Sequence, residues 1–349
     1  MIILRIVIYI ITVAHLISIG LALIKKDFWV FRIFDYPRMQ KFVILASVMI
    51  VFFIFFRNDF IWIDWLLMCL VFISLVYLAY LILPFTIVGK KMISENKDPL
   101  LKKLQIVVAN VYQENKDHKK LLQLIELRKP DVLLLVETDH NWQKSLQILK
   151  QTYPYYIEVP KDNTYGMLFY SRFKILHHQI KYLVDPEIPS IEADIEFDDQ
   201  TIKLFALHPT PPSPTENLYS TDRDAEILMV AKKAKHIKGP CMVIGDLNDV
   251  AWSYTTELFL KTSGLLDPRR GRGWYNTYNA KYVVFRWPLD HLFVSGHFRL
   301  VDIKVEKHIG SDHFPISMSV VLSEKDDSGK LKLTLNDEET ANEKIAQPD

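Results

Sequence analysis

Three long apolar runs in the first 85 residues constrain the fold of this chain more than any other feature. They cover residues 1–24, 42–56 and 60–85. A bilayer core of about 30 Å requires about 20 apolar residues per helix. The first and third runs reach that length, and tilting or local thinning of the bilayer accommodates the shorter second run. The sequence therefore predicts a membrane domain of three transmembrane helices over residues 1–85.

A secretory signal peptide is the alternative interpretation of the first run. Its apolar region would span about 7–15 residues and precede a cleavage site of small residues, whereas this run is longer and ends in Ile-Lys-Lys-Asp. Ionisable residues inside a membrane are candidates for function, and Arg5, His15 and Asp64 lie in or beside the runs. Arg5 and Asp64 lie close to polar ends, so we favour interfacial roles for both and a hydrogen-bonded neutral ring for His15.

Overall composition says less about fold and function than the apolar runs do. The formal net charge is +1, which gives no argument for a nucleic-acid partner. The two cysteines, Cys69 and Cys241, each lie in an apolar stretch. Both are expected to be buried thiols, and they indicate neither a disulfide nor a redox compartment.

The character of the chain changes after Pro84. Lysines punctuate residues 86–103, which we interpret as a linker. From residue 104 to 322, short apolar stretches typical of strands alternate with stretches of helical periodicity, as in Asp117–Lys129. This pattern predicts an α/β (α+β) fold in which two packed sheets carry helices on their outer faces. Residues 323–349 are charged and polar without apolar periodicity, and we expect them to be disordered.

Several predicted strands end on side chains that suit phosphate or metal chemistry. The segment Pro-Cys-Met-Val-Ile-Gly-Asp-Leu-Asn-Asp places Asp246 and Asn248 two residues apart, on one side of an extended chain. Hard cations such as Mg²⁺ prefer carboxylate and carbonyl oxygens, and histidines beside carboxylates suit proton transfer. A carboxylate-rich cleft repels phosphate unless a cation offsets its charge. The other strand-end residues of this kind are Asn110, Glu137, His208, Asp290, Asp312 and His313.

In this order, the segments resemble the endonuclease/exonuclease/phosphatase superfamily, which includes deoxyribonucleases, neutral sphingomyelinases and inositol polyphosphate phosphatases. The resemblance extends from about residue 104 to 322. The segments that carry it are Val-Ala-Asn-Val-Tyr, Leu-Leu-Val-Glu-Thr, Tyr-Gly-Met-Leu-Phe-Tyr-Ser-Arg, Phe-Ala-Leu-His-Pro, Ile-Gly-Asp-Leu-Asn, Pro-Leu-Asp-His-Leu-Phe-Val and Gly-Ser-Asp-His-Phe-Pro-Ile.

The resemblance implies a four-layer sandwich and metal-assisted attack of water on a phosphate ester. It implies catalytic roles for His208, Asp246, Asn248, Asp290 and His313. It assigns Mg²⁺, or Mn²⁺ in its place, to Asn110, Glu137 and Asp312. We expect substrate contacts from Tyr165 and Arg172 in the third segment, and from Arg272 and Trp274 in the loop described next.

Two segments depart from the better-known members of the family. His-Pro-Thr-Pro-Pro-Ser-Pro (208–214) is a stiff, proline-rich loop. Residues 267–287 interleave arginines with aromatic residues, which suits a phosphate and either a stacked base or lipid headgroups; a surface loop with solvated arginines explains the pattern equally well. The layout of three leading helices and a proline-rich loop is similar to that of membrane-tethered bacterial members.

The chain is thus expected to be a multi-pass membrane protein that hydrolyses a nucleic-acid or phospholipid-type phosphoester. Its partners would be that substrate and the bilayer, without an obligate protein partner. Basic residues in the first loop, residues 25–41, slightly favour a cytoplasmic catalytic domain by the positive-inside rule. A membrane scaffold that kept the fold but lost turnover is the alternative function. A transport component ranks last, since three helices with few buried charges provide no pathway.

Overall fold

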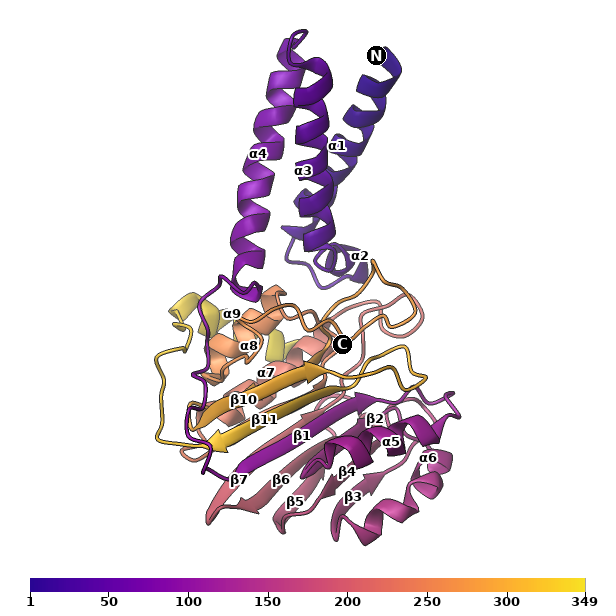
Figure 1. Cartoon of the computed structure of the whole chain (residues 1–349), viewed down its shortest axis with the longest axis vertical. Helices are drawn as coiled ribbons and strands as arrows, with labels where there is room; N and C mark the ends of the chain where they lie inside the picture. The colour runs from indigo at the N-terminus through magenta and orange to yellow at the C-terminus, as the bar shows by residue number, and fades with distance from the viewer. Residues whose placement is uncertain (349) are drawn as a thin grey trace.

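Three long helices form one end of the molecule. The computed structural model describes residues 1–348. In it, α1 (Ile2–Ala22), α3 (Arg38–Phe56) and α4 (Trp62–Ile82) are long and apolar enough to cross a membrane, and the short helix η1 (Leu83–Phe85) extends the third. They pack through a shared cluster that includes Leu45, Phe52 and Val71. Figure 1 shows them projecting from the sandwich, with the short α2 (Trp29–Ile33) lying at their base.

The ionisable residues near the helix ends have structural partners. Asp64 is buried at the start of α4, where it accepts hydrogen bonds from the Ile61 amide and the Tyr9 hydroxyl. Arg5 lies 3.6 Å from the Asp64 carboxylate. The His15 ring donates from Nδ1 to the Ile11 carbonyl at 2.8 Å. These contacts explain Asp64 and Arg5 as residues that cap and pack the helices.

The remainder of the chain contains two mixed sheets. The first has the order β10 (Phe298–Val305), β11 (Ile316–Leu322), β1 (Lys103–Asn110), β2 (Val132–Val136), β4 (Met167–Ser171), β3 (Tyr155–Val159). The second has the order β5 (Ile175–Lys181), β6 (Ser190–Phe197), β7 (Gln200–Leu207), β8 (Cys241–Asp246), β9 (Asp290–Val294). Only β1–β2 and β7–β8 pair in parallel among the described strands.

Alternation along the strands produces the layers. Ile106 and Val108 of β1 join the core between the two sheets, whereas Val107 and Ala109 pack against the helices outside. Helices α5 (His118–Arg128) and α6 (His140–Ser145), with η2 (Gln147–Gln151), cover the first sheet, and α7 (Thr221–Lys235) and α8 (Tyr254–Ser263) cover the second. The predicted sandwich of two sheets flanked by helices is confirmed.

Strand register brings the polar strand ends to one edge of the sandwich. Asn110 lies opposite Val136, so the next residue of that strand, Glu137, is its neighbour. In the second sheet Leu207 lies opposite Gly245, and Asp246 lies opposite Asp290. Both sheets therefore place these polar strand-end residues at the same end of the sandwich.

Residues 86–103, expected to form a linker, pack against the catalytic domain. Met92 and Ile93 are buried in the core between the sheets. The Leu300 amide of β10 donates to the Ser94 carbonyl at 2.9 Å, and the Asn96 amide donates to the Leu300 carbonyl at 2.8 Å. The segment is therefore anchored along the edge of the first sheet.

The C-terminal segment differs from the expected disorder. Residues Leu335–Ala346 form α9, which begins with a capping box between Thr334 and Asp337. Ala341 is fully buried against Leu228 of α7 and Leu258 of α8. The expectation of disorder is wrong for this helix, because its few buried apolar residues give only a weak periodic signal in a polar sequence. Asp349 lies outside the described residues.

A buried ion cluster joins the loop between α1 and α3 to the sandwich. Arg32 of α2 donates to the carboxylate of Asp224 at 3.1 Å, and Lys344 of α9 donates to the same carboxylate at 2.9 Å. Lys344 also donates to Asp27 at 2.7 Å. Nearby, the Trp252 indole donates to the Asp35 carbonyl at 2.9 Å. The loop between α1 and α3 is thus fixed above the edge of the sandwich where the polar residues meet.

We expect Ala341→Glu to undock α9, since a carboxylate would replace a buried methyl group. A loss of about 1–3 kcal/mol, typical of such substitutions, would accelerate limited proteolysis within residues 335–346 about tenfold per 1.4 kcal/mol. Ala346→Glu is the matched control, because Ala346 is exposed at the end of the same helix. Equal cleavage rates for both variants and the unmodified chain would show that α9 is not docked.

Candidate active site

Asn110 links two carboxylates that are distant in the sequence. Its side-chain amide donates to Glu137 Oε1 at 2.6 Å and to Asp246 Oδ2 at 3.0 Å. Its carbonyl oxygen accepts from the Tyr112 amide at 3.0 Å. Asn110 therefore points its NH₂ group, and not its oxygen, at the carboxylates. This geometry suits a residue that positions Glu137 and Asp246 better than the metal ligand expected from the sequence.

A second chain of contacts runs from Asp246 through His313 to Asp290. His313 donates from Nδ1 to Asp290 Oδ2 at 2.9 Å, and its Nε2 lies 3.5 Å from Asp246 Oδ2. Burial lowers the pKa of His313, but the charges of Asp246 and Asp290 outweigh burial and raise that pKa to about 10. At neutral pH this ring is therefore an imidazolium held between two carboxylates.

His208 differs from His313 although both rings are buried. Burial lowers the pKa of His208 to about 4, and the more distant Asp246, at 4.0 Å, only partly opposes this effect. Its Nδ1 has no hydrogen-bond partner within residues 1–348. The Tyr165 ring lies beside it, with centroids 5.3 Å apart. The site thus combines one charged and one neutral imidazole.

Backbone geometry explains the Gly-Asp-Leu-Asn segment. Gly245 has φ +142°, and a Cβ there would lie 1.9 Å from the Leu207 carbonyl oxygen, so only glycine fits. Asp246 Oδ1 accepts from the Asn248 amide at 3.0 Å, which closes a tight turn. Asn248 adopts a left-handed φ of 51° and donates from its side chain to the Pro209 carbonyl at 2.9 Å. The turn holds both polar side chains beside the end of β7.

Glu137 and Asp312 form the part of the site with uncompensated negative charge. Burial raises the pKa of Glu137 to about 7. The hydrogen bond from Asn110 and the charge of His313 lower this pKa, whereas the charges of Asp312 and Asp246 raise it further. Asp312 Oδ1 is buried without a hydrogen-bond partner among the described residues. Asp246, Asp290 and His313 also place ligand-type atoms within 4.8 Å of one another, but the imidazolium already balances that group. Both groups therefore offer atoms that could hold a divalent cation: the Glu137 and Asp312 carboxylates, and the Asp246–Asp290–His313 group.

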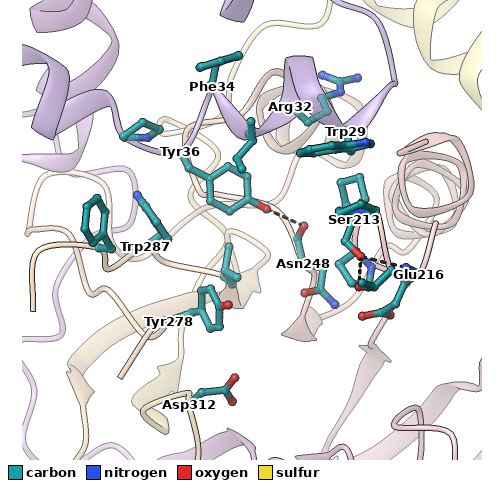
Figure 2. A pocket seen from close by; sticks show the side chains of 18 of the residues that line it. Trp29, Arg32, Phe34, Tyr36, Ser213, Glu216, Asn248, Tyr278, Trp287 and Asp312 are labelled. Carbon is teal, nitrogen blue, oxygen red and sulfur yellow. Dashed lines mark hydrogen bonds between the residues drawn. The ribbon is translucent and has the colours of Figure 1, made fainter. Parts of the chain in front are cut away.

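These residues lie at one end of a cavity of about 1080 Å³. Glu137, His208, Asn248, Asp312 and His313 all line it. Figure 2 shows Asp312 and Tyr278 on one side, Asn248 in the middle, and side chains of the α1–α3 loop on the opposite side. The cavity therefore lies between the sandwich and the helices α1 and α3.

Among the predicted substrate-binding residues, only Tyr165 lines this cavity. Arg172 follows the opposite end of β4, where its guanidinium lies 5.4 Å from the Tyr153 ring centroid. Arg272 donates to the Ile93 carbonyl at 2.7 Å and so anchors the linker segment. Trp274 packs against Trp252 at 5.2 Å. These three side chains do not line the described cavity, because each is engaged in contacts elsewhere in the protein.

Sequence reasoning missed the aromatic residues Trp29 and Tyr36, which come from the loop between α1 and α3. Tyr278 and Trp287 also line the cavity, and they come from the arginine-rich loop that the sequence singled out. The Tyr36 hydroxyl donates to the Asn248 carbonyl at 3.3 Å, and its ring lies 5.4 Å from that of Trp287. The dense aromatic run of residues 27–37 was the available signal.

Comparisons with known proteins identify the family and the fold. Residues 107–313 match the family model described as "Endonuclease/Exonuclease/phosphatase family". Three structural neighbours cover similar parts of the chain. Zebrafish (D. rerio) TDP2 complexed with a single-strand DNA product has a TM-score of 0.53 and 19% identity, and covers 63% of this chain and 99% of that one.

The other two neighbours have similar scores. The human Nocturnin catalytic domain with a bound sulfate anion has a TM-score of 0.52 and 15% identity, over 64% of this chain and 96% of that one. An endonuclease/exonuclease/phosphatase from Beutenbergia cavernae has a TM-score of 0.52 and 16% identity, over 64% and 72%. At these identities the likeness establishes the fold alone, and no curated protein matches the sequence. The family match spans more than half of the chain, which therefore belongs to the endonuclease/exonuclease/phosphatase family.

Proposed function

We propose that this protein is a membrane-anchored, divalent-metal-dependent phosphoester hydrolase. A water molecule would attack phosphorus in line with the ester bond that breaks. The observation that carries the proposal is the continuous network from Glu137 through Asn110 and Asp246 to His313 and Asp290. Each of these side chains comes from a different strand end. A titratable group whose pKa is strongly shifted by specific charge partners, at the edge of a cavity, is typical of an active site and favours an enzyme over a scaffold.

Glu137 and Asp312 would hold the cation, Mg²⁺ or Mn²⁺. Their oxygens are the hard ligands that such ions prefer, and the partnerless Asp312 Oδ1 offers a coordination position. When bound, the ion would supply Lewis-acid stabilisation of charge on the phosphate and leaving oxygens. Asn110 would hold Glu137 in place through its 2.6 Å hydrogen bond.

The remaining residues would handle the water and the phosphate. The Asp246 carboxylate would orient the water and accept its proton as the oxygen bonds to phosphorus and the ester bond breaks. The His313 imidazolium would donate to a phosphate oxygen where charge develops, oriented by Asp290. Neutral His208 would donate a second hydrogen bond. One N–H of the Asn248 amide binds Pro209, which leaves the other for the phosphate.

The three helices would anchor the enzyme in a bilayer. With three spans, the loop between α1 and α3 and the catalytic domain share one side, as Figure 1 shows. The exposed Lys25 and Lys26 in this loop support a cytoplasmic location by the positive-inside rule. A reporter fused after residue 322 would test the orientation.

We expect Asp246→Asn to reduce Mg²⁺-dependent hydrolysis of bis(p-nitrophenyl) phosphate about 10²–10⁴-fold, the usual contribution of a general base. The amide keeps the size of the side chain but cannot accept the proton. Asp199→Asn, in the exposed turn between β6 and β7, is the matched control and should retain full activity. Unchanged hydrolysis in Asp246→Asn would reject the assigned role, and Mg²⁺ binding without any turnover by the unmodified protein would favour the scaffold.

We also expect Mg²⁺ to raise the thermal unfolding temperature of the detergent-solubilised protein. Ligand at about 100 times its Kd stabilises a folded protein by about 2.7 kcal/mol. Glu137→Gln should abolish most of this shift, whereas Glu196→Gln, at an exposed position of β6, should preserve it. A shift that survives in Glu137→Gln but disappears in Asp290→Asn would instead place the ion at the Asp246–Asp290–His313 group.

A further inference from the structure

The cavity continues from the phosphate-facing residues into the membrane helices. Resting on the hydrolase function proposed above, we infer that this cavity binds a membrane lipid that carries a phosphate ester. The phosphorus lies beside Asp246 and His313, and the apolar chain lies between α1 and α3. The binding site is thus shared between the catalytic domain and two transmembrane helices.

Residues inside the apolar spans line the same cavity as His313. They include Ala14 and Ser18 of α1 and Ile44 of α3. At 1.5 Å per residue, Ala14 lies about 12 Å from the end of α1 at Ala22, whereas Ile44 lies about 3 Å inside the apolar run of α3 that begins at Phe42. Along α1 the cavity therefore reaches about two helical turns into the layer that lipid chains occupy. No described residue of α4 lines it, so the space lies between α1 and α3.

Along this path the lining changes from acidic and imidazole side chains to mainly apolar and aromatic ones, although His15, Ser18, Gln40 and Lys41 also line the end between α1 and α3. The end beside the strands carries Glu137, Asp312 and the two histidines, and the middle carries Tyr36 and Tyr278. Above them lie Trp29, Ile33 and Phe34. Figure 2 shows Trp29 and Phe34 in this position. Such a gradient matches an amphiphile with one charged end. The volume of about 1080 Å³ lies at the upper limit of the roughly 300–1,000 Å³ common for small-molecule sites.

The charges in the cavity argue against a nucleic-acid substrate. Single-stranded nucleic acids bind along grooves with available basic side chains. Arg32 and Lys41 are the two Arg or Lys side chains among the described lining residues. Arg32 is bound by Asp27 and Asp224, and Lys41 donates to the Ser18 and Phe34 carbonyls. The described lining residues therefore offer no free Arg or Lys side chain for the successive phosphates of a polyanion, whereas a lipid brings a single phosphate group to the site.

The arginine-rich loop, residues 267–287, also favours a lipid over a nucleic acid as the substrate. Arg269 is buried on Asp267, and Arg286 donates to the Tyr282 and Ala280 carbonyls, so these cations are engaged within the protein. The tip of the loop is instead apolar and exposed: Tyr282, Val283, Val284 and Phe285 are 59%, 79%, 65% and 54% exposed.

This exposed tip lies at the level of the membrane surface. The Gln40 side chain, in the first turn of α3, donates to the Val284 carbonyl at 2.7 Å. Ile87 and Val88, just after the third span, are also exposed, at 81% and 76%. Apolar side chains at this depth bind the boundary between headgroups and acyl chains. The face around the cavity therefore rests on the bilayer, where lipid has lateral access between α1 and α3.

The test compares three p-nitrophenyl phosphodiesters that share one leaving group: the methyl, hexadecyl and thymidine 5′ esters. The full chain is assayed with Mg²⁺ in detergent micelles. We expect kcat/KM for the hexadecyl ester to exceed that of the other two by about tenfold or more, since each buried methylene contributes to binding. Ala14→Trp fills the space between α1 and α3 and should remove that advantage, leaving methyl-ester hydrolysis within about twofold.

Val13→Trp is the matched control, because Val13 is 44% exposed on the same helix and is not among the described lining residues. It should leave all three rates unchanged. A preference for the thymidine ester, or an Ala14→Trp effect equal for all three esters, would overturn the lipid site while leaving the hydrolase function intact. Absence of hydrolysis of any ester by the unmodified chain would reject the hydrolase function itself and the inference with it.

Discussion

The buried carboxylate of Asp224 is the interaction on which the arrangement of the whole molecule depends. It accepts hydrogen bonds from Arg32 of α2, Arg223 of α7, Thr255 of α8 and Lys344 of α9. Burial raises its pKa, but these cations outweigh burial and hold the pKa well below the usual range of an aspartate. A buried charge is tolerated only when such partners surround it. One side chain thus fixes the membrane loop, the C-terminal helix and the sandwich to one another.

The same cluster extends into the catalytic site. Arg223 donates to the Asn248 carbonyl at 2.8 Å, and the Tyr36 hydroxyl donates to that oxygen from the membrane side. The position of the Gly-Asp-Leu-Asn turn therefore depends on where the α1–α3 loop lies. We infer that the membrane helices are part of the catalytic unit and do more than anchor it. Charge at the site is balanced in two ways, by the His313 imidazolium for Asp246 and Asp290 and by a proposed cation for Glu137 and Asp312.

The sequence was sufficient for the layers and the catalytic strand ends, because buried strands read as apolar runs that end on polar residues. The edge strands β3, β5 and β10 carry mixed side chains and lack that signal. Helix α9 was missed because a single buried face in a polar sequence has little contrast. The contribution of Trp29 and Tyr36 could not be predicted, since no local pattern shows that two distant segments meet. Arg172 was assigned to substrate from the resemblance, and Arg272 and Trp274 from their place in the arginine-rich loop. Their side chains contact Tyr153, Ile93 and Trp252 away from the cavity, which no local pattern shows.

The most direct measurement of the shared cavity is photocrosslinking with hexadecyl phosphate that carries a diazirine at the end of its chain. Mass spectrometry of the full chain in lipid nanodiscs should find the label concentrated on peptides that contain Ala14–Ser18 of α1 and Gln40–Ile44 of α3. Excess unlabelled hexadecyl phosphate should remove this labelling, and α4 should be labelled only at the background level of bulk lipid. Labelling spread evenly over α1, α3 and α4, and insensitive to competition, would contradict a lipid site that is continuous with the catalytic residues.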